Sequence, residues 1–258
     1  MSRRLHRGGG TSLPGLLALR LDPKILSKLT NKLSDSVVIT GTNGKTTTAN
    51  MLAAIFRTHG SEFIHNTAGA NLVSGLLTAM IGGIGYGSQS QKIGLFEVDE
   101  ATIPKVTPQL QPKIVAVTNI FRDQLDRYGE LDHTAELIKS ALTSLDDNAR
   151  VVLNSDDPRV AVLADGLNLR PIFFGIEDER RAAFHLDQAR DSNECLLCGT
   201  ALEYKFQYFA HLGIYTCPKC GFTRPEPQFK AVDIELALGG THFKVITPVG
   251  SLKLKTKL

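Results

Sequence analysis

Short apolar, β-branched runs alternate with amphipathic stretches along most of the chain between residues 36 and 176. The runs have the length of strands that are buried on both faces, and the stretches between them are long enough for helices. The predicted strands are 36–40, 92–100, 112–120, 149–157 and 170–176. The predicted helices are 45–60, 71–83, 133–145 and 158–167. This alternation predicts an α/β fold with a doubly wound, mostly parallel sheet.

The remaining parts of the chain follow other patterns. Residues 1–30 read as a basic tail followed by the start of a short amphipathic helix. Residues 190–225 have no helical period and are rich in cysteine and aromatic residues. Residues 231–240 and 242–258 alternate apolar and polar side chains, as antiparallel hairpin strands do. We therefore predict an N-terminal tail and helix, 1–30, and one central domain, 31–258, into which 190–225 is inserted.

Two of the helices carry additional signals. The N-terminal helix has a start signal at Asp22 and Pro23. Helix 45–60 ends at Gly60, a residue type that commonly closes helices because it accepts a left-handed backbone. The apolar positions that make this helix amphipathic are Met51, Leu52, Ile55 and Phe56.

The composition excludes several classes of protein. With 42% hydrophobic and 21% charged residues among 258, the chain has an ordinary globular composition. A net charge of +3 with scattered basic residues argues against nucleic acid as a partner. No segment reads as a secretory signal. The longest other apolar run, 71–87, is interrupted by glycines and is shorter than the ~20 residues of a membrane span, so an integral membrane protein is not predicted.

A glycine-rich turn joins strand 36–40 to helix 45–60. Its glycines allow the backbone to fold tightly, so that several N–H groups point at one phosphate, and the helix adds the positive end of its dipole. Lys45 can reach the terminal phosphates of a nucleotide, and the hydroxyl of Thr46 can bind Mg²⁺. Only G-x-x-G-K-T is present, which is shorter than the standard phosphate-binding spacing; a chance turn is the alternative. The residues expected at the ATP phosphates are Gly41, Thr42, Asn43, Gly44, Lys45, Thr46 and Thr47.

Polar residues at other strand ends are candidates for the same site. Glu97 lies at the edge where open α/β sheets bind their ligands, so its carboxylate can complete the Mg²⁺ shell begun by Thr46. The alternative is that Glu97 is a solvated acid, and Asp99 and Glu100 after it are weaker candidates. Three further residues can hydrogen-bond phosphate, substrate or metal-bound water, or else only stabilise a turn. They are Asn71, Asn119 and Asp123.

All four cysteines form two C-x-x-C pairs that are separated by 18 residues, Gly199 to Thr216. Two such knuckles at this separation fit a tetrahedral Cys₄ zinc site, and a glycine follows each knuckle. Four thiolates close the coordination shell, so the zinc is expected to be structural and to supply folding energy to the insert. A redox pair is the alternative. The expected zinc ligands are Cys195, Cys198, Cys217 and Cys220. Clustered free cysteines suit a reducing cytoplasm.

Together these motifs resemble the Mur ligase family, which includes the peptidoglycan ligases and folylpolyglutamate synthetase. The resemblance rests on "GTNGKTT" and on the later segments "NTAGANL", "FEVDEA", "TNIFRDQLDRYG" and "LNSDDPRV". It implies a ligase that uses ATP to phosphorylate a carboxylate and lets an amine attack the acyl phosphate, with Lys45 and Glu97 as catalytic residues. Gln124 stands where many members have a metal-binding histidine. Lys139 matches the family's modified lysine, or else is a solvated helix residue.

The predicted zinc insert narrows this resemblance, because most Mur ligases lack one. A Mur ligase core that carries a Cys₄ ribbon and lacks the UDP-binding N-terminal domain resembles the amidating synthetase subunits of the family. This implies ATP- and glutamine-dependent conversion of the D-glutamate of lipid II to D-isoglutamine, in peptidoglycan biosynthesis. The implied partner is a GatD-like glutaminase that supplies ammonia. The implied location is the cytoplasm, at the inner membrane face where lipid II is anchored.

Members of the family continue with the rest of the central domain and with a C-terminal domain that closes over ATP. Because this sequence stops at Leu258 among predicted hairpin strands, we expect a fragment or a truncated product that lacks this domain. Two alternative functions remain open. One is an amino-acid-adding ligase of the muramyl or folylpolyglutamate type. The other is a non-catalytic zinc-ribbon module with a vestigial nucleotide loop.

Overall fold

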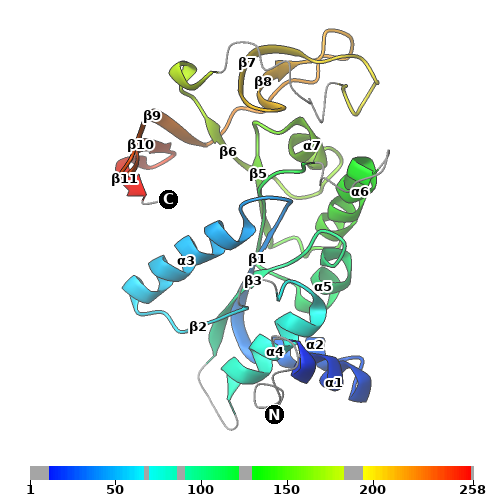
Figure 1. Ribbon diagram of the computed structural model, residues 1–258. Coiled ribbons are helices and arrows are strands. Elements are labelled where there is room, and N and C mark those ends of the chain that lie inside the picture. The colour runs from blue at the N-terminus through cyan, green and yellow to red at the C-terminus, as the bar shows by residue number, and fades with distance from the viewer. Residues whose placement is uncertain (1–11, 67–69, 86–90, 122–129, 183–193, 257–258) are drawn as a thin grey trace.

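The computed structural model describes residues 12–66, 70–85, 91–121, 130–182 and 194–256. A nine-stranded sheet in the order β11-β10-β9-β6-β5-β4-β1-β3-β2 runs through the molecule (Figure 1). Each neighbouring pair from β2 to β9 in this order is parallel. The strands are β1 (Leu33–Thr40), β2 (Phe63–His65), β3 (Lys92–Glu97), β4 (Ile114–Val117), β5 (Arg150–Asn154), β6 (Ile172–Ile176), β9 (Phe229–Ala237), β10 (Gly240–Thr247) and β11 (Gly250–Thr256). The predicted doubly wound, mostly parallel sheet is confirmed.

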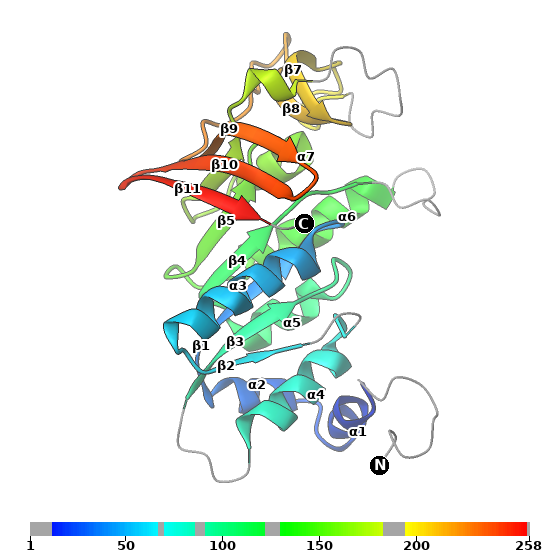
Figure 2. The same ribbon diagram turned by 60° about the vertical axis from the view of Figure 1, so that its left-hand side comes forward.

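Helices cover both faces of the parallel part. Helix α3 lies on one face, and α4, α5 and α6 lie on the other (Figures 1 and 2). Helix α1 packs against α4, and α2 contacts α5. The helices are α1 (Leu13–Leu21), α2 (Ile25–Thr30), α3 (Lys45–His59), α4 (Val73–Ile84), α5 (Ile103–Leu110), α6 (Glu130–Thr143) and α7 (Pro158–Ala161). The 3₁₀ segments are η2 (Val162–Ala164) and η3 (Glu179–Arg181).

The central strand β1 shows why its sequence is apolar without interruption. Neighbouring residues of a strand point to opposite faces of the sheet, and here both faces are covered. Val38 and Ile39 are both fully buried, the first in the large cluster under α4, α5 and α6 and the second in a smaller cluster with Ala49 and Ala53 of α3. The side chains of β1 therefore pack against helices on both faces of the sheet.

Helix α3 has the predicted extent and ends before Gly60, which has a φ of 78°. Its buried side, however, is made by Ala49 and Ala53, whereas Met51 and Ile55 are 40% and 60% exposed. The two alanines let the helix axis come close to β1 and β3, so the bulkier apolar residues lie at the margin of the contact. The small size of these side chains therefore determines which side of α3 faces the sheet. Counting apolar residues along the sequence does not reveal this.

Several elements differ from the prediction. Helix α1 was not expected, and α5 was hidden by Pro104 in its first turn and Pro108 in its interior. Pro104 is compatible with a first turn, and the buried Ile103, Val106 and Leu110 hold α5 in place against the cost of Pro108. The predicted helix 158–167 is only the single turn of α7, which continues as the 3₁₀ segment η2.

The chain between β6 and β9 forms a separate layer at one end of the sheet. It contains the two-stranded antiparallel sheet of β7 (Glu203–Phe209) and β8 (Leu212–Thr216), drawn at the top of Figure 1. After it, β9 returns to the main sheet beside β6, and β10 and β11 complete the predicted antiparallel hairpins. No helix in the described part of the chain combines the length and the apolar character needed to span a lipid bilayer.

Candidate functional site

The glycine-rich turn lies where the carboxyl ends of β1, β3 and β4 meet. We call Gly41–Thr47 the nucleotide loop and Thr118–Phe121, which follows β4, the bracing segment. Gly41 has a φ of 117°, and a Cβ there would lie 2.4 Å from Oγ1 of Thr118 and 2.8 Å from the carbonyl oxygen of Asn119. Only glycine fits this combination of left-handed backbone and close approach. The tight turn expected from the sequence is therefore forced by the neighbouring strand end.

The bracing segment holds the nucleotide loop through hydrogen bonds to its backbone. The amide of Thr42 donates to the carbonyl of Asn119 at 2.8 Å, and the amide of Asn43 donates to Oδ1 of Asn119 at 2.9 Å. The Asn119 side chain also donates to the Asn43 carbonyl at 3.1 Å, and the Thr118 hydroxyl donates to the same oxygen at 2.7 Å. Of the two roles considered for Asn119, these contacts favour stabilisation of the loop.

Lys45, the first residue of α3, is folded back over the nucleotide loop. Its ammonium donates to the carbonyl of Gly41 and, at 3.1 Å, to that of Thr42. It also lies 3.4 Å from the carboxylate of Glu100, and both side chains are only 14% exposed. Glu100, ranked low from the sequence, is thus the acid that faces Lys45. The sequence signal for this contact was only its place three residues beyond the end of a strand.

Thr46 and Glu97 come together as a pair of oxygen groups. The Thr46 hydroxyl donates to Oε2 of Glu97 at 2.8 Å, and the Glu97 carboxylate is 3% exposed. Its other oxygen, Oε1, accepts no hydrogen bond from any described residue, although Nε2 of His65 lies 3.4 Å away. A buried carboxylate with an unsatisfied oxygen beside a hydroxyl fits a hard cation such as Mg²⁺. His65 was missed by the sequence analysis.

Glu97 is held in position by a buried asparagine. Asn66 accepts a hydrogen bond from the Glu97 amide at 2.9 Å and donates to the carbonyls of Glu97 and Ala70 at 2.8 Å each. Asn71, by contrast, is half-buried, and its carbonyl accepts from the Asp99 amide at 3.1 Å. Asn66 therefore fixes the strand end from which the Glu97 side chain reaches Thr46.

The remaining candidates from the sequence fall elsewhere. Lys139, on α6, donates to the carbonyls of Leu163 and Asp165 around η2, and burial lowers the pKa of its ammonium. These contacts place it beside η2 and not with the cluster around Lys45. Asp123 and Gln124 lie outside the described residues.

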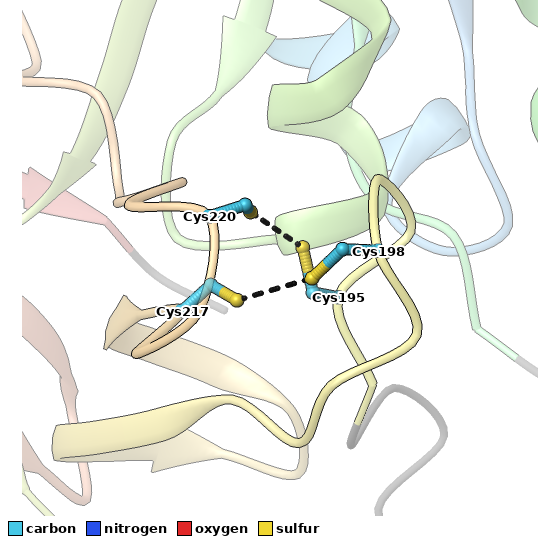
Figure 3. Close-up of side chains that lie close together, drawn as sticks. All are labelled: Cys195, Cys198, Cys217 and Cys220. Atoms are coloured by element: carbon cyan, nitrogen blue, oxygen red, sulfur yellow. Dashed lines mark hydrogen bonds between the residues drawn. The ribbon is translucent and has the colours of Figure 1, made fainter.

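The four cysteines converge from two knuckles, as Figure 3 shows. All four Sγ atoms lie within 4.8 Å of one another, with 3.5 Å between those of Cys195 and Cys220 and the same between those of Cys198 and Cys217. In each knuckle the glycine after the second cysteine donates its amide to the carbonyl of the first, at 2.8 Å for Gly199 and 3.1 Å for Gly221. This is the arrangement that a tetrahedral metal ion with four sulfur ligands needs.

The environment of the thiols is uneven in the absence of a metal. Hydrogen bonds from Thr200 lower the pKa of Cys198 to about 6. Burial raises the pKa of Cys195 to about 12. A buried thiol that resists ionisation in the apo protein becomes a thiolate when a cation binds beside it, because the metal supplies the compensating charge.

Residues 39–215 match the sequence profile of the Mur ligase middle domain. The chain belongs to the Mur ligase family. Two similar relatives are the subunits named MurT of lipid II isoglutaminyl synthase (glutamine-hydrolyzing). The one from Staphylococcus aureus (strain COL) is 33% identical over 231 residues, 88% of this chain and 50% of the relative. The one from Streptococcus pneumoniae (strain R6) is 33% identical over 241 residues, 92% of this chain and 52% of the relative.

This Mur ligase chain thus spans about half the length of the curated relatives that it matches. Among solved structures, the MurF ligase from Thermotoga maritima in complex with ADP aligns with a TM-score of 0.57. That alignment covers 90% of this chain and 43% of the MurF chain at 15% identity, so it shows the shared fold alone.

The pair formed by Thr46 and Glu97 leads to a prediction about Mg²⁺ binding. Glu97→Gln removes the anionic oxygen beside Thr46, so the Mg²⁺ concentration needed for half-maximal ATP binding is expected to rise about tenfold. Glu136→Gln, a change on α6 at a side chain that is 81% exposed, is the matched control and is expected to leave the Mg²⁺ requirement unchanged. Titration of Mg²⁺ at fixed ATP with each variant measures the difference. An equal Mg²⁺ requirement in Glu97→Gln and the parent would exclude Glu97 as a ligand.

The four cysteines generate a second prediction. We expect the purified chain to hold about one Zn²⁺, by elemental analysis, and Cys217→Ser to lose it. The loss is expected to lower the melting temperature by on the order of 5 °C, because the insert then loses its cross-link. Lys219→Ala, an exposed change within the same knuckle, is the control and is expected to keep both the zinc and the melting temperature. A chain that is as stable after chelation as before contradicts a structural role.

Proposed function

We propose that this chain is the ATP-binding part of a synthetase that amidates the D-glutamate α-carboxyl of lipid II. The observation that carries the proposal is the nucleotide loop, on which Lys45 and the Thr46–Glu97 pair converge at the carboxyl ends of parallel strands. Open α/β sheets bind ligands at this edge. The MurF relative in complex with ADP supports a nucleotide as the ligand. The two MurT relatives support amidation as the reaction.

The proposed reaction has two steps. An oxygen of the substrate carboxylate attacks the γ-phosphorus of ATP, the bond to the β-phosphate oxygen breaks, and ADP leaves. Ammonia then attacks the acyl carbon of the resulting acyl phosphate, and inorganic phosphate leaves as the amide forms with loss of a proton. Phosphoryl transfer of this kind depends on positioning and on stabilisation of charge at the transferred group.

The residues of the loop have defined tasks in this scheme. Lys45, whose ammonium contacts the carbonyls of Gly41 and Thr42, is proposed to neutralise charge on the γ-phosphoryl group. Glu100 keeps the ammonium close to the loop. The amides of Thr42 and Asn43 already donate to Asn119, so the backbone amides of Gly44–Thr47, at the start of α3, are proposed to bind the phosphates. Thr46 and Glu97 would hold Mg²⁺, which offsets the charge of the phosphates when bound.

The zinc ion at Cys195, Cys198, Cys217 and Cys220 is proposed to be structural, since four protein ligands leave no position open for a substrate. The proposed partner is a glutaminase subunit that supplies ammonia, as the glutamine-hydrolyzing name of the relatives suggests. The proposed place of action is the cytoplasmic face of the membrane, where a lipid-anchored substrate is reached. Residues 31–258 are proposed to act as one central domain.

Substitution of the loop lysine tests the proposal. In the complete complex with its glutaminase, Lys45→Ala is expected to lower ATP-dependent amidation by on the order of 10²–10³-fold, because one cation at the transferred group is lost. Zinc content is expected to stay unchanged. Lys105→Ala, an exposed lysine of α5, is the matched control.

The same assay separates the alternatives. An unchanged amidation rate in Lys45→Ala would show that the nucleotide loop is not the ATP site of the reaction. Product formation with a free amino acid, and none with glutamine or ammonia, indicates an amino-acid-adding ligase. No binding of Mg²⁺-ATP at all indicates a zinc-ribbon module without catalysis.

A further inference from the structure

We propose that His211 is a positioning residue for the nucleotide loop, and that the insert between β6 and β9 presents it. We call residues 194–224 of this insert the Cys₄ hairpin. The inference deepens the proposed function and rests on it, because the loop that His211 positions is the proposed ATP site. A line of contacts joins the nucleotide loop to this hairpin.

The first contact joins the nucleotide loop to the end of the bracing segment. The hydroxyl of Thr42 accepts a hydrogen bond from the Phe121 amide at 3.0 Å and donates to the Phe121 carbonyl at 3.3 Å. Together with the hydrogen bonds that the amides of Thr42 and Asn43 donate to Asn119, these contacts fix one side of the loop backbone to the bracing segment. The position of Phe121 therefore sets the position of Thr42.

The second contact joins the bracing segment to a buried aspartate. Oδ2 of Asp157 accepts from the Ile120 amide at 2.8 Å, while Oδ1 caps α7 by accepting from the amides of Arg159 and Val160. The Asp157 side chain is fully buried. Burying a carboxylate costs free energy unless its oxygens accept hydrogen bonds, so these three amides keep the Asp157 side chain in this position. It ties Ile120 to the start of α7.

The third contact brings in the hairpin. His211 lies in the turn between β7 and β8 and is fully buried, with Nε2 3.3 Å from Oδ2 of Asp157. Its ring also packs on Phe121, at 4.6 Å between centroids, and the ring of Phe209, the last residue of β7, lies 5.8 Å from the Phe121 ring. His211 thus contacts Asp157, which holds the bracing segment, and Phe121, which is the last residue of that segment.

His211 is not explained by the stability of the hairpin itself. Within the part of the chain that the structure describes, neither of its ring nitrogens has a hydrogen bond of good geometry, although its side chain is excluded from water. Burying an imidazole without hydrogen bonds costs free energy, so an apolar residue at this position would make the hairpin itself more stable. Its position is explained by what it faces outside the hairpin, namely Asp157 and Phe121.

Independent contacts seat the hairpin on the same strand end, so that His211 is held and not merely nearby. The Tyr215 hydroxyl donates to the Ser155 carbonyl at 3.1 Å, and the Gly213 amide donates to the Asp156 carbonyl at 2.8 Å. Arg224 donates to the Asp156 carboxylate at 2.8 Å and to Glu177 at 2.6 Å. Residues that follow His211 therefore fasten the Cys₄ hairpin to the chain just after β5 and β6.

The test measures amide exchange in the nucleotide-free chain, residue by residue, by NMR. In His211→Ala, the amides of Thr42, Asn43, Ile120 and Phe121 are expected to exchange about tenfold faster, because the bracing segment opens more often. Amides of β1 and α3 are expected to stay as protected as in the parent. If His211 only stabilises the hairpin, exchange rises in β7 and β8 alone, and that result overturns the proposal.

Two further variants keep the test decisive. His211→Gln retains an N–H that can reach Asp157 but loses the ring on Phe121, so its exchange rates are expected to lie between those of the parent and His211→Ala. Phe209→Ala changes a side chain that is 65% exposed, and it serves if His211→Ala fails to fold. It is expected to raise exchange at Phe121. Unchanged exchange at the bracing segment in both Phe209→Ala and His211→Gln overturns the proposal.

The matched control is Thr216→Val, an exposed change in β8 that lies away from the Phe121 contact. It is expected to leave the four amides unchanged. Titration with Mg²⁺-ATP then adds the functional readout. Because amides that are still protected from exchange belong to a loop that is closed in most molecules, His211→Ala is expected to raise the dissociation constant less than about twofold. If the parent binds no ATP, the proposed function fails, while the exchange data still decide whether His211 positions the loop.

Discussion

The close passage of Gly41 against Thr118 and Asn119 is the constraint on which the rest of the site depends. It joins the carboxyl ends of β1 and β4 with no room for a side chain. The Thr42 and Asn43 amides are used to bind the bracing segment, and this fixes where α3 begins. Lys45 and Thr46, the first two residues of α3, consequently face the ends of β3, where Glu97 and Glu100 lie. In this Mur ligase middle domain, the ends of the strands thus determine the position of the nucleotide loop.

Those parts of the fold that depend on local pattern could be predicted from the sequence. The apolar run of β1, the turn with Gly41 and Gly44 and the stop at Gly60 each act within a few residues, and each was placed correctly. The cysteine knuckles could be predicted for the same reason, because their spacing is a local property. Helix α5 was lost because Pro108 opposes it locally, and only burial of its apolar side against the core restores it.

The contacts that depend on tertiary structure could not be predicted. Glu100 faces Lys45 across 55 positions of the sequence, and His211 meets Asp157 across 54. Nothing in the sequence around His211 distinguishes it from a solvated loop histidine, since its partners are the residue that caps α7 and a residue of the segment after β4. The segment "LNSDDPRV", noted only for its resemblance, proves to be the base on which the Cys₄ hairpin rests. The Cys₄ hairpin therefore packs against the residues that support the nucleotide loop.

The central claim is that Thr46 and Glu97 hold a divalent cation together with a nucleotide. Electron paramagnetic resonance of Mn²⁺, which shares the preference of Mg²⁺ for oxygen ligands, tests it directly. The Mn²⁺-ATP spectrum is expected to change when the chain is added, and Thr46→Ala is expected to abolish this change. A spectrum that the chain leaves unaltered, or one that Thr46→Ala alters as much as the parent does, would show that Thr46 and Glu97 do not hold the cation.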